Sequence, residues 1–318
     1  QVIVNLFNTV PYIGNDLSVW LRGDYVLGDA ALNRFFALHF FVPVIVLPAL
    51  VFVHIVALHA VGSNNPDGVE IKKGPKGNRW APDAPTDGIP FHPYYTVKDI
   101  LGVAVFLLIF FAILFFTPEM GGYFIEQPNF EPANPLKTPL HIAPVWYFTP
   151  FYTVLRAVPD PWWGTVAMFA AIIVLFLLPW LDKNPIKSWR YRNPAHKINL
   201  LLFAVVFLVL GWMGVEAVTT VYKELGTRMT QIYFLFFVVL WLHSYPAKVN
   251  YKKWFGILLG IVVVYDLVFR LNLGDGAATT QMLLQFIWPV IYLAATLLLP
   301  AFVPSFNQEK PVPERVTG

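Results

Sequence analysis

Three of the seven histidines lie on one long apolar stretch, residues 31–62. His39 and His54 are fifteen residues apart, which in an α-helix separates them by about 60° in rotation and roughly 22 Å along the axis. Neutral imidazole is a common axial ligand of haem iron, and histidine inside a membrane usually has a binding role. The spacing therefore fits two haems at different depths. Two interfacial histidines bonded to neighbouring helices fit it equally well.

The stretch that carries these histidines predicts a membrane-spanning helix. The segment 35–60 contains no charged residue, and it is long enough to cross a hydrocarbon core about 30 Å thick. Pro43 and Pro48 interrupt its backbone hydrogen bonds, so the angle between the histidines is only a guide. Gly62 stands where a glycine could cap the end of the helix.

The composition is that of an integral membrane protein, with 57% hydrophobic and 13% charged residues. Cysteine is absent, which excludes disulfides, thiolate-bound iron–sulfur clusters and thiol catalysis, so histidine would have to hold any metal. We predict an all-α, polytopic transmembrane helix bundle of about seven spans, with short interfacial helices in residues 1–30 and 117–161. The predicted spans are 35–60, 100–116, 162–181, 198–215, 229–246, 254–269 and 279–303.

One predicted span contains an acidic residue. Asp266 precedes Arg270 by four residues, so the two side chains share a helix face. We therefore expect an intrahelical ion pair near the interface rather than a proton relay.

The basic residues predict which side each loop faces. If the loops alternate sides, the segments 62–98, 183–197, 248–253 and 310–315 fall together and carry 15 of the 22 basic residues. The positive-inside rule then places these segments in the cytoplasm. His39 would lie toward the outer face and His54 toward the inner face.

Several long motifs resemble the cytochrome b subunit of ubiquinol–cytochrome c reductase, the cytochrome bc complex. They are LNRFFALH, VHIVALHAVGSNNPDG, FHPYYTVKDILG and ANPLKTPLHIAPVWYFTPFYTVLRAVPD, in the family's order between residue 2 and about residue 215. The ending KPVPERV is similar to that of the proteobacterial-type members. The resemblance implies that His39 binds the low-potential b-type haem and His54 the high-potential one. Arg34 is a candidate partner for a haem propionate, or equally a snorkelling arginine.

The resemblance also implies an inner site for ubiquinone reduction at His59, Lys98 and Asp99. A quinone that is reduced in an apolar setting needs protons along with its electrons, and histidine and aspartate can deliver them. The alternative for Asp99 is a carboxylate that stabilises the N-terminus of the next helix.

The outer, quinol-oxidising site departs from the family pattern. Where the family has Pro-Glu-Trp-Tyr, residues 144–147 are Pro-Val-Trp-Tyr, and Val145 cannot accept a proton. We expect Tyr147 to form a hydrogen-bonding wall of the pocket. The proton acceptor could be Tyr147, a water chain to a propionate, or a carboxylate of the loop, for which the candidates are Glu119, Glu126 and Glu131.

The order of motifs suggests three regions. Residues 1–62 are the end of the N-terminal cytochrome b region, 63–220 the C-terminal region with the quinol-oxidation loop 117–161, and 221–318 additional transmembrane helices and a cytoplasmic tail. The family usually has about one span after residue 220, whereas this chain has three.

The family carries the opposing haem ligands on an earlier helix, but no histidine precedes His39. The other four histidines lie where the family has no ligands: His92, His141, His196 and His243. We therefore expect the chain to be the later part of something longer, or to receive its first helices from another polypeptide; its first residues show no targeting segment.

The resemblance implies a haem- and quinone-binding subunit of a respiratory, multisubunit quinol–cytochrome c reductase in the bacterial inner membrane. It would pass electrons from ubiquinol through two b-type haems and contribute to proton translocation. The implied partners are a Rieske iron–sulfur subunit, a cytochrome c-type subunit, quinone, membrane lipid and a second copy in a homodimer, without nucleic acid. A photosynthetic relative that uses plastoquinone has a compatible histidine spacing. A cofactor-free transporter or scaffold is the alternative, but it leaves the order of motifs unexplained.

Overall fold

The computed structural model describes residues 2–62, 64–70, 91–122, 124–125, 127–132, 134–137, 142–245, 249–270 and 276–314. Within these residues every regular element is a helix. The chain forms two compact units. The first unit comprises Gln1–Ser63, Ala133–Pro185 and Arg192–Glu309; the second comprises Asn64–Pro132, Ile186–Tyr191 and Lys310–Gly318.

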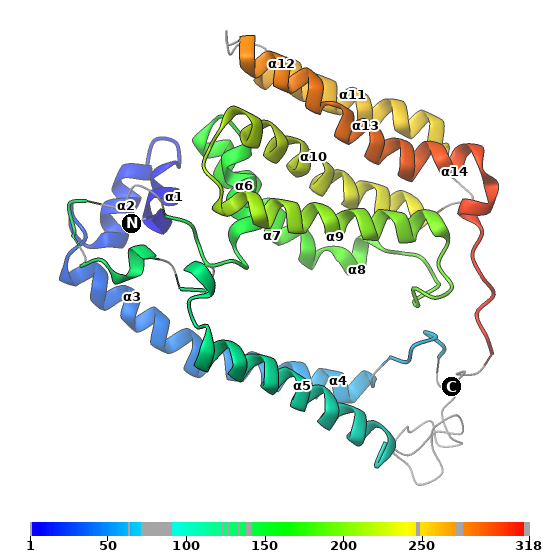
Figure 1. The fold of residues 1–318 in the computed structure, drawn as a ribbon, viewed down its shortest axis with the longest axis horizontal. Helices are drawn as coiled ribbons and strands as arrows, with labels where there is room; N and C mark the ends of the chain where they lie inside the picture. The colour runs from blue at the N-terminus through cyan, green and yellow to red at the C-terminus, as the bar shows by residue number, and fades with distance from the viewer. Residues whose placement is uncertain are drawn as a thin grey trace. The chain divides into compact units, whose positions relative to one another are not determined.

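The first unit begins with two short helices and one long one. Helices α1 (Val2–Asn8) and α2 (Gly14–Arg22) precede a continuous helical run made of α3 (Asp29–Phe41), the π-helical segment η1 (Val42–Val46) and α4 (Leu47–Val61) (Figure 1). Pro43 lies inside the π-helical segment. A π-turn skips the ordinary hydrogen bond, so it accommodates a proline without ending the helix.

Gly62 ends this helix as the sequence predicts. Its φ is +80°, a backbone conformation that side chains disfavour, and its N–H donates to the carbonyl of Leu58 at 2.7 Å. The glycine cap is therefore confirmed.

The centre of the first unit is a bundle of helices with well-defined starts. It contains α6 (Thr149–Ala157), α7 (Pro161–Phe176), α8 (Leu178–Leu181), α9 (Pro194–Val215) and α10 (Thr220–His243). Asp160, Asn193 and Thr219 cap α7, α9 and α10 by accepting hydrogen bonds from backbone N–H groups three residues later. These side chains fix where each helix begins.

Helix α10 is the most buried of the long helices, and α9 packs beside it (Figure 1). The rings of Phe203 on α9 and Phe236 on α10 stack with centroids 4.0 Å apart. The hydroxyl of Tyr233 donates to the carbonyl of Ala171 on α7 at 2.7 Å. Aromatic packing and one satisfied buried hydroxyl thus hold α10 against two neighbours.

The remaining helices of the first unit are α11 (Tyr251–Phe269), α12 (Gly276–Gln285), α13 (Ile287–Leu293), the π-helical η6 (Ala294–Leu298), α14 (Leu299–Phe302) and the short η7 (Pro304–Asn307). Buried charges connect α11 to α10. Asp266 accepts from Arg228 Nη1 at 2.7 Å and lies 3.4 Å from Arg270 Nη1, while Arg270 Nη2 also pairs with Glu224. The predicted Asp266–Arg270 pair is confirmed, as part of a larger network.

The second unit contains α5 (Tyr94–Phe116) and the short helices η2 (Met120–Gly122) and η3 (Gln127–Phe130). Its loop segments are held together by polar side chains. Asp67 is 1% exposed and accepts hydrogen bonds from Arg190 Nη1 at 2.9 Å and from the hydroxyl of Tyr191 at 2.7 Å. The Ser188 hydroxyl donates to the carbonyl of Pro66 at 2.6 Å. Pro66 and Asp67 therefore anchor this loop to the segment that carries Ser188, Arg190 and Tyr191.

The predicted all-α, polytopic bundle is confirmed. Five helices of the described chain are long and apolar enough to cross a membrane: Asp29–Val61, Tyr94–Phe116, Pro194–Val215, Thr220–His243 and Thr279–Phe302. The other two predicted spans coincide with α7, an apolar helix of 16 residues, and with α11, whose 19 residues include Lys252, Lys253 and Asp266.

Candidate functional site

The predicted haem ligands lie on the exposed run of α3, η1 and α4. His39 is in α3, His54 is in α4, and both side chains are exposed within the unit that contains them. No residue in the most apolar window of this helix is buried. An exposed imidazole on an uncharged membrane helix requires a partner, because an unpaired polar group in hydrocarbon is costly.

The donor set suits a haem better than a bare metal ion. In the part of the chain that the structure describes, no group of three or more His, Cys, Asp or Glu residues could hold a metal. A haem carries its own four nitrogen ligands, so one imidazole from each side completes the iron coordination. His39 and His54 each offer one such imidazole. The helix is therefore compatible with one imidazole ligand for each of two haems.

Arg34 lies next to the end of α2. Its Nη1 donates to the carbonyls of Trp20 and of Leu21, the latter at 3.3 Å, and its guanidinium packs over Gly23, which has a φ of +77°. A cation at the C-terminus of a helix stabilises the unpaired carbonyls there. Arg34 therefore joins α2 to α3, a contact that the sequence did not reveal.

The predicted inner quinone residues come from two helices. His59 is exposed in the last turn of α4. Lys98 and Asp99 are exposed on α5, where Lys98 Nζ lies 5.5 Å from the ring centroid of Tyr95. Because α5 begins at Tyr94, Asp99 is its sixth residue and lies beyond the first turn, so the helix N-terminus does not explain this carboxylate.

Tyr147 lies in the turn that leads into α6. Its side chain is 52% exposed, and its ring centroid lies 5.4 Å from that of Trp146 in an edge-on arrangement. The turn is fixed on both sides, because the N–H of Phe148 donates to Val145 O at 2.8 Å and the hydroxyl of Thr149 to Trp146 O at 2.6 Å. Tyr147 is thus presented on an ordered turn.

The loop carboxylates remain open as proton acceptors. Glu119 and Glu131 are both exposed, whereas Glu126 lies outside the described residues. His141, which the sequence places in the same loop, is also outside them.

Helix α6 is held tightly by α9 and α10. A Cβ added at Gly214 on α9 would lie 2.5 Å from the carbonyl oxygen of Thr149, so only glycine allows this approach. The hydroxyl of Thr153 donates to Leu210 O at 2.7 Å, and that of Thr227 on α10 donates to Ala157 O at 3.1 Å. The turn that carries Tyr147 therefore rests on a rigid base.

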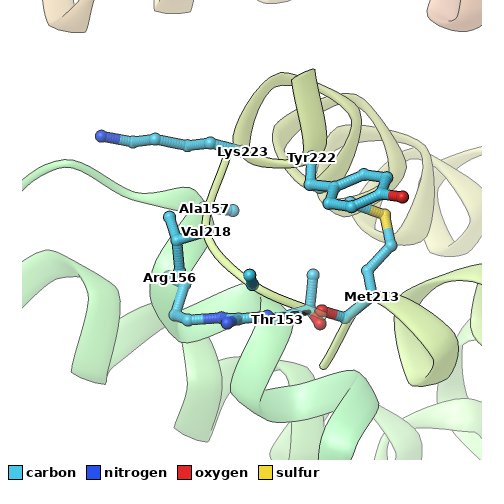
Figure 2. Close-up of a pocket in the computed structure, with 9 residues that line it drawn as sticks. Thr153, Arg156, Ala157, Met213, Val218, Tyr222 and Lys223 are labelled. Carbon is cyan, nitrogen blue, oxygen red and sulfur yellow. Dashed lines mark hydrogen bonds between the residues drawn. The ribbon is translucent and has the colours of Figure 1, made fainter. Parts of the chain in front are cut away.

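A small hollow opens beside α6 (Figure 2). Its cavity volume is about 20 Å³, room for little more than one water molecule, and it contains none of the predicted site residues. It is lined by Thr153, Arg156, Ala157, Met213, Ala217, Val218, Tyr222, Lys223 and Gly226.

Arg156 in this hollow has a structural task. It donates to Glu216 O at 3.2 Å and also to Met213 O, which caps the C-terminal end of α9. Burial lowers the pKa of Arg156 below its ordinary value, and the neighbouring Tyr152 opposes that change. A guanidinium stays protonated under such conditions, so Arg156 remains a fixed positive charge.

Three buried polar residues were missed from the sequence: Arg228, His196 and His243. Arg228, which the charge count assigned to the outer side, is 0% exposed inside the bundle. The signal was present, because Glu224 and Arg228 have the same i, i+4 spacing as Asp266 and Arg270. His196 and His243 are also buried, and no local pattern indicated this.

Comparisons with known proteins match most of this chain. Residues 1–150 match the family "Cytochrome b(N-terminal)/b6/petB" and residues 132–234 the family "Cytochrome b(C-terminal)/b6/petD". Cytochrome b of Allochromatium vinosum is 60% identical over 248 residues, which cover 77% of this chain and 60% of that protein. Cytochrome b of Rickettsia bellii is 44% identical over 252 residues, covering 79% and 58% of the two chains.

A solved structure titled "Hyperthermophilic respiratory Complex III" aligns with a TM-score of 0.67 and 34% identity, covering 77% of this chain and 62% of that one. The chain thus spans about three fifths of the length of these relatives. Residues 235–318 lie beyond both family matches.

Proposed function

Because this chain belongs to the cytochrome b family, we propose that it is the haem- and quinone-binding subunit of a respiratory quinol–cytochrome c oxidoreductase. The observation that carries the proposal is the pair of exposed histidines, His39 and His54, on one continuous uncharged helix. A cofactor-free transporter or scaffold would account neither for this pair nor for the family matches.

His39 and His54 would each hold a b-type haem through an imidazole nitrogen, His39 the low-potential haem and His54 the high-potential one. When bound, the two haems supply one-electron carriers at two depths of the membrane. The π-helical segment between the histidines keeps the helix unbroken past Pro43, so both ligands stay on one rigid element. Arg34, whose hydrogen bonds to the backbone of α2 both use Nη1, would also offer charge to a haem propionate.

The inner quinone site would use His59, Lys98 and Asp99 to deliver protons. Reduction of a quinone to a quinol takes up two electrons and two protons, and the imidazole and carboxyl groups can pass protons from the cytoplasm to the quinone oxygens. Lys98 would hold negative charge on a quinone oxygen until it is protonated. All three side chains are exposed and thus free to meet a ligand.

The outer site would oxidise quinol beside Tyr147. The phenol can donate a hydrogen bond to a quinol oxygen, and the turn before α6 fixes its position. Since Val145 cannot accept a proton, Tyr147, a water chain or a loop carboxylate must receive the protons that the quinol releases.

The family also suggests where the subunit works. We infer that it lies in the bacterial inner membrane, with residues 62–98 and the C-terminus in the cytoplasm, because most basic residues fall on that side. Its partners would be a Rieske iron–sulfur subunit, a cytochrome c-type subunit and a second copy in a homodimer. Residues 221–318 would add helices that the usual family member lacks.

A dithionite-minus-ferricyanide difference spectrum of membranes that express the complete reading frame tests the haem assignment. We expect His39→Leu and His54→Leu each to remove one of two b-type haem signals. His92→Leu is the matched control, because His92 is an exposed histidine whose Nδ1 lies 3.2 Å from the hydroxyl of Thr96, and this variant should retain both signals. Two signals in both ligand variants, in protein that still inserts, would overturn the proposal.

Steady-state quinol oxidation tests Tyr147. If its hydroxyl forms a hydrogen bond with quinol worth about 1 kcal/mol, Tyr147→Phe should slow the reaction roughly fivefold with both haem spectra unchanged. Tyr152→Phe serves as the control, because Tyr152 lies on α6 against Arg156. An unchanged rate in Tyr147→Phe would remove the tyrosine from the site.

A further inference from the structure

A second pair of histidines lies where α9 begins and α10 ends, and the proposed electron path does not use it. His196 is 8% exposed and His243 only 1%. The two imidazoles are within electrostatic range of each other. Buried histidines at this density are costly unless each ring nitrogen has a partner.

The tautomer of His243 follows from its one hydrogen bond. Its Nε2 lies 3.0 Å from the carbonyl oxygen of Thr296 in η6. A carbonyl can only accept, so Nε2 carries the proton and Nδ1 of the neutral ring is a bare acceptor. Among the residues that the structure describes, no donor reaches this Nδ1.

Four more buried polar atoms near these rings also have no hydrogen-bond partner among the described residues. No hydrogen-bond partner within the described ranges reaches Asn193 Nδ2, His196 Nδ1, Asn199 Nδ2 or the hydroxyl of Tyr251. The rings of His243 and Tyr251 lie 6.0 Å apart, Asn193 caps the helix turn that holds His196, and Asn199 follows His196 by three residues on α9. Unpaired buried polar groups are destabilising, so five of them in one region indicate a shared hydrogen-bond partner.

The mixture of donors and acceptors identifies the ligand. The amide nitrogens of Asn193 and Asn199 can only donate, whereas Nδ1 of His243 can only accept. A metal ion would accept lone pairs and would be repelled by amide N–H groups. Water donates and accepts at once, and a buried water typically makes about three hydrogen bonds. We propose that this cluster binds buried water, bridging the two histidines and the two asparagines.

The proposed hydration site includes a contact that crosses the end of the family matches at residue 234. Asn199 on α9 lies within them and accepts a 2.6 Å hydrogen bond from the hydroxyl of Tyr292 on α13, which lies beyond them. His243 on α10 also lies beyond residue 234 and bonds to η6. The water would therefore complete a polar joint that holds α13 and η6 against α9 and α10.

High-resolution cryo-electron microscopy of the complete complex in lipid nanodiscs tests the site directly. We expect an ordered water about 2.7–3.2 Å from Nδ1 of His243, with a second contact to one of the other four polar atoms. Density about 2.0–2.2 Å from Nδ1 together with a bound metal, or a protein side chain in that position, would overturn the proposal.

His243→Gln separates the water contact from the helix contact. A glutamine can still donate to Thr296 O but lacks the Nδ1 acceptor, so the helices should stay in place while the water density is lost. Tyr233→Phe is the matched control, because it removes a buried hydroxyl of α10 that already has its partner, Ala171 O. Water that persists unchanged in His243→Gln would exclude Nδ1 as its ligand.

Hydrogen exchange tests the joint. In Asn199→Leu, amide exchange of residues 287–298 should be faster by severalfold, while Tyr233→Phe should leave it unchanged. Unchanged exchange in Asn199→Leu would refute the role of the cluster in holding α13 and η6, and both haem signals verify that each variant is assembled.

Discussion

The run α3–η1–α4 and helix α10 are both long apolar helices with histidines, yet the first is exposed and the second is buried within the fold. In the most apolar 18 residues of α3–η1–α4 no residue is buried, whereas 72% of the corresponding residues of α10 are buried. The histidines of the first are exposed, while His243 at the end of α10 is bonded to a carbonyl of its own chain. A histidine that the fold leaves uncovered is the candidate for a cofactor, and one that the fold covers belongs to the packing.

The difference extends to the charged residues. Arg34 on α3 is exposed and donates to the end of α2, while Arg228 on α10 is fully buried and donates to Asp266, to Gln231 and to the carbonyl of Met282 on α12. The burial of α10 is possible because the two arginines and two carboxylates of its network cancel in charge.

The largest loss of stability is expected from a variant that breaks this ion-pair network. Arg228→Met leaves Asp266 with only its 3.4 Å contact to Arg270, and removing one partner of a buried ion pair costs about 3–5 kcal/mol. Detergent unfolding of the complex should show this loss. Lys223→Met, an exposed lysine on the same helix, should change stability by less than about 0.5 kcal/mol.

We expect the double variant Arg228→Met with Asp266→Leu to recover most of the stability that Arg228→Met loses, because replacing a whole buried ion pair with apolar side chains is often neutral. If the double variant is also severely destabilised, the loss of stability in Arg228→Met does not come from the unpaired charge of Asp266.

An intermediate effect is expected where α9 meets α6. Gly214→Ala places a methyl group 2.5 Å from the backbone of Thr149, and such overpacking costs about 1–3 kcal/mol. Because this contact supports the turn that carries Tyr147, quinol oxidation should also slow. Gly211→Ala is the control, since its Cβ would meet Pro150 at an ordinary 3.5 Å. Equal effects in both variants would mean that the close approach has no special role.

The smallest expected effect concerns the exposed helix. Arg34→Gln removes a positive charge and a cap of α2, worth about 0.3–1 kcal/mol. If Arg34 also pairs with a propionate, its loss should lower the midpoint potential of the haem at His39, because a reduced haem gains from a nearby cation. Redox titration measures this midpoint potential. Arg22→Gln is the control, because Arg22 donates to Ser18 O within α2 and to Tyr25 O just after it. An unchanged potential would limit Arg34 to capping.

The sequence alone determined the features of this protein that depend only on neighbouring residues along the chain. An uncharged stretch long enough for a membrane predicts a helix, and an i, i+4 spacing predicts the Asp266–Arg270 pair. The fifteen-residue spacing of His39 and His54 fits two ligands on that helix, and this stays a prediction. The ordered motifs indicated the family, which the comparisons confirm. These features need no knowledge of which helix lies beside which.

Only the tertiary structure decided which side chains are covered. The sequence could not show that Arg228 reaches Asp266 across two helices, that Gly214 must admit the backbone of Thr149, or that His243 is buried while His54 is exposed. The apolar helices look alike in sequence because lipid and protein interior both favour the same residues. Burial depends on the neighbours that the fold brings in from distant parts of the chain, and no local pattern encodes those neighbours.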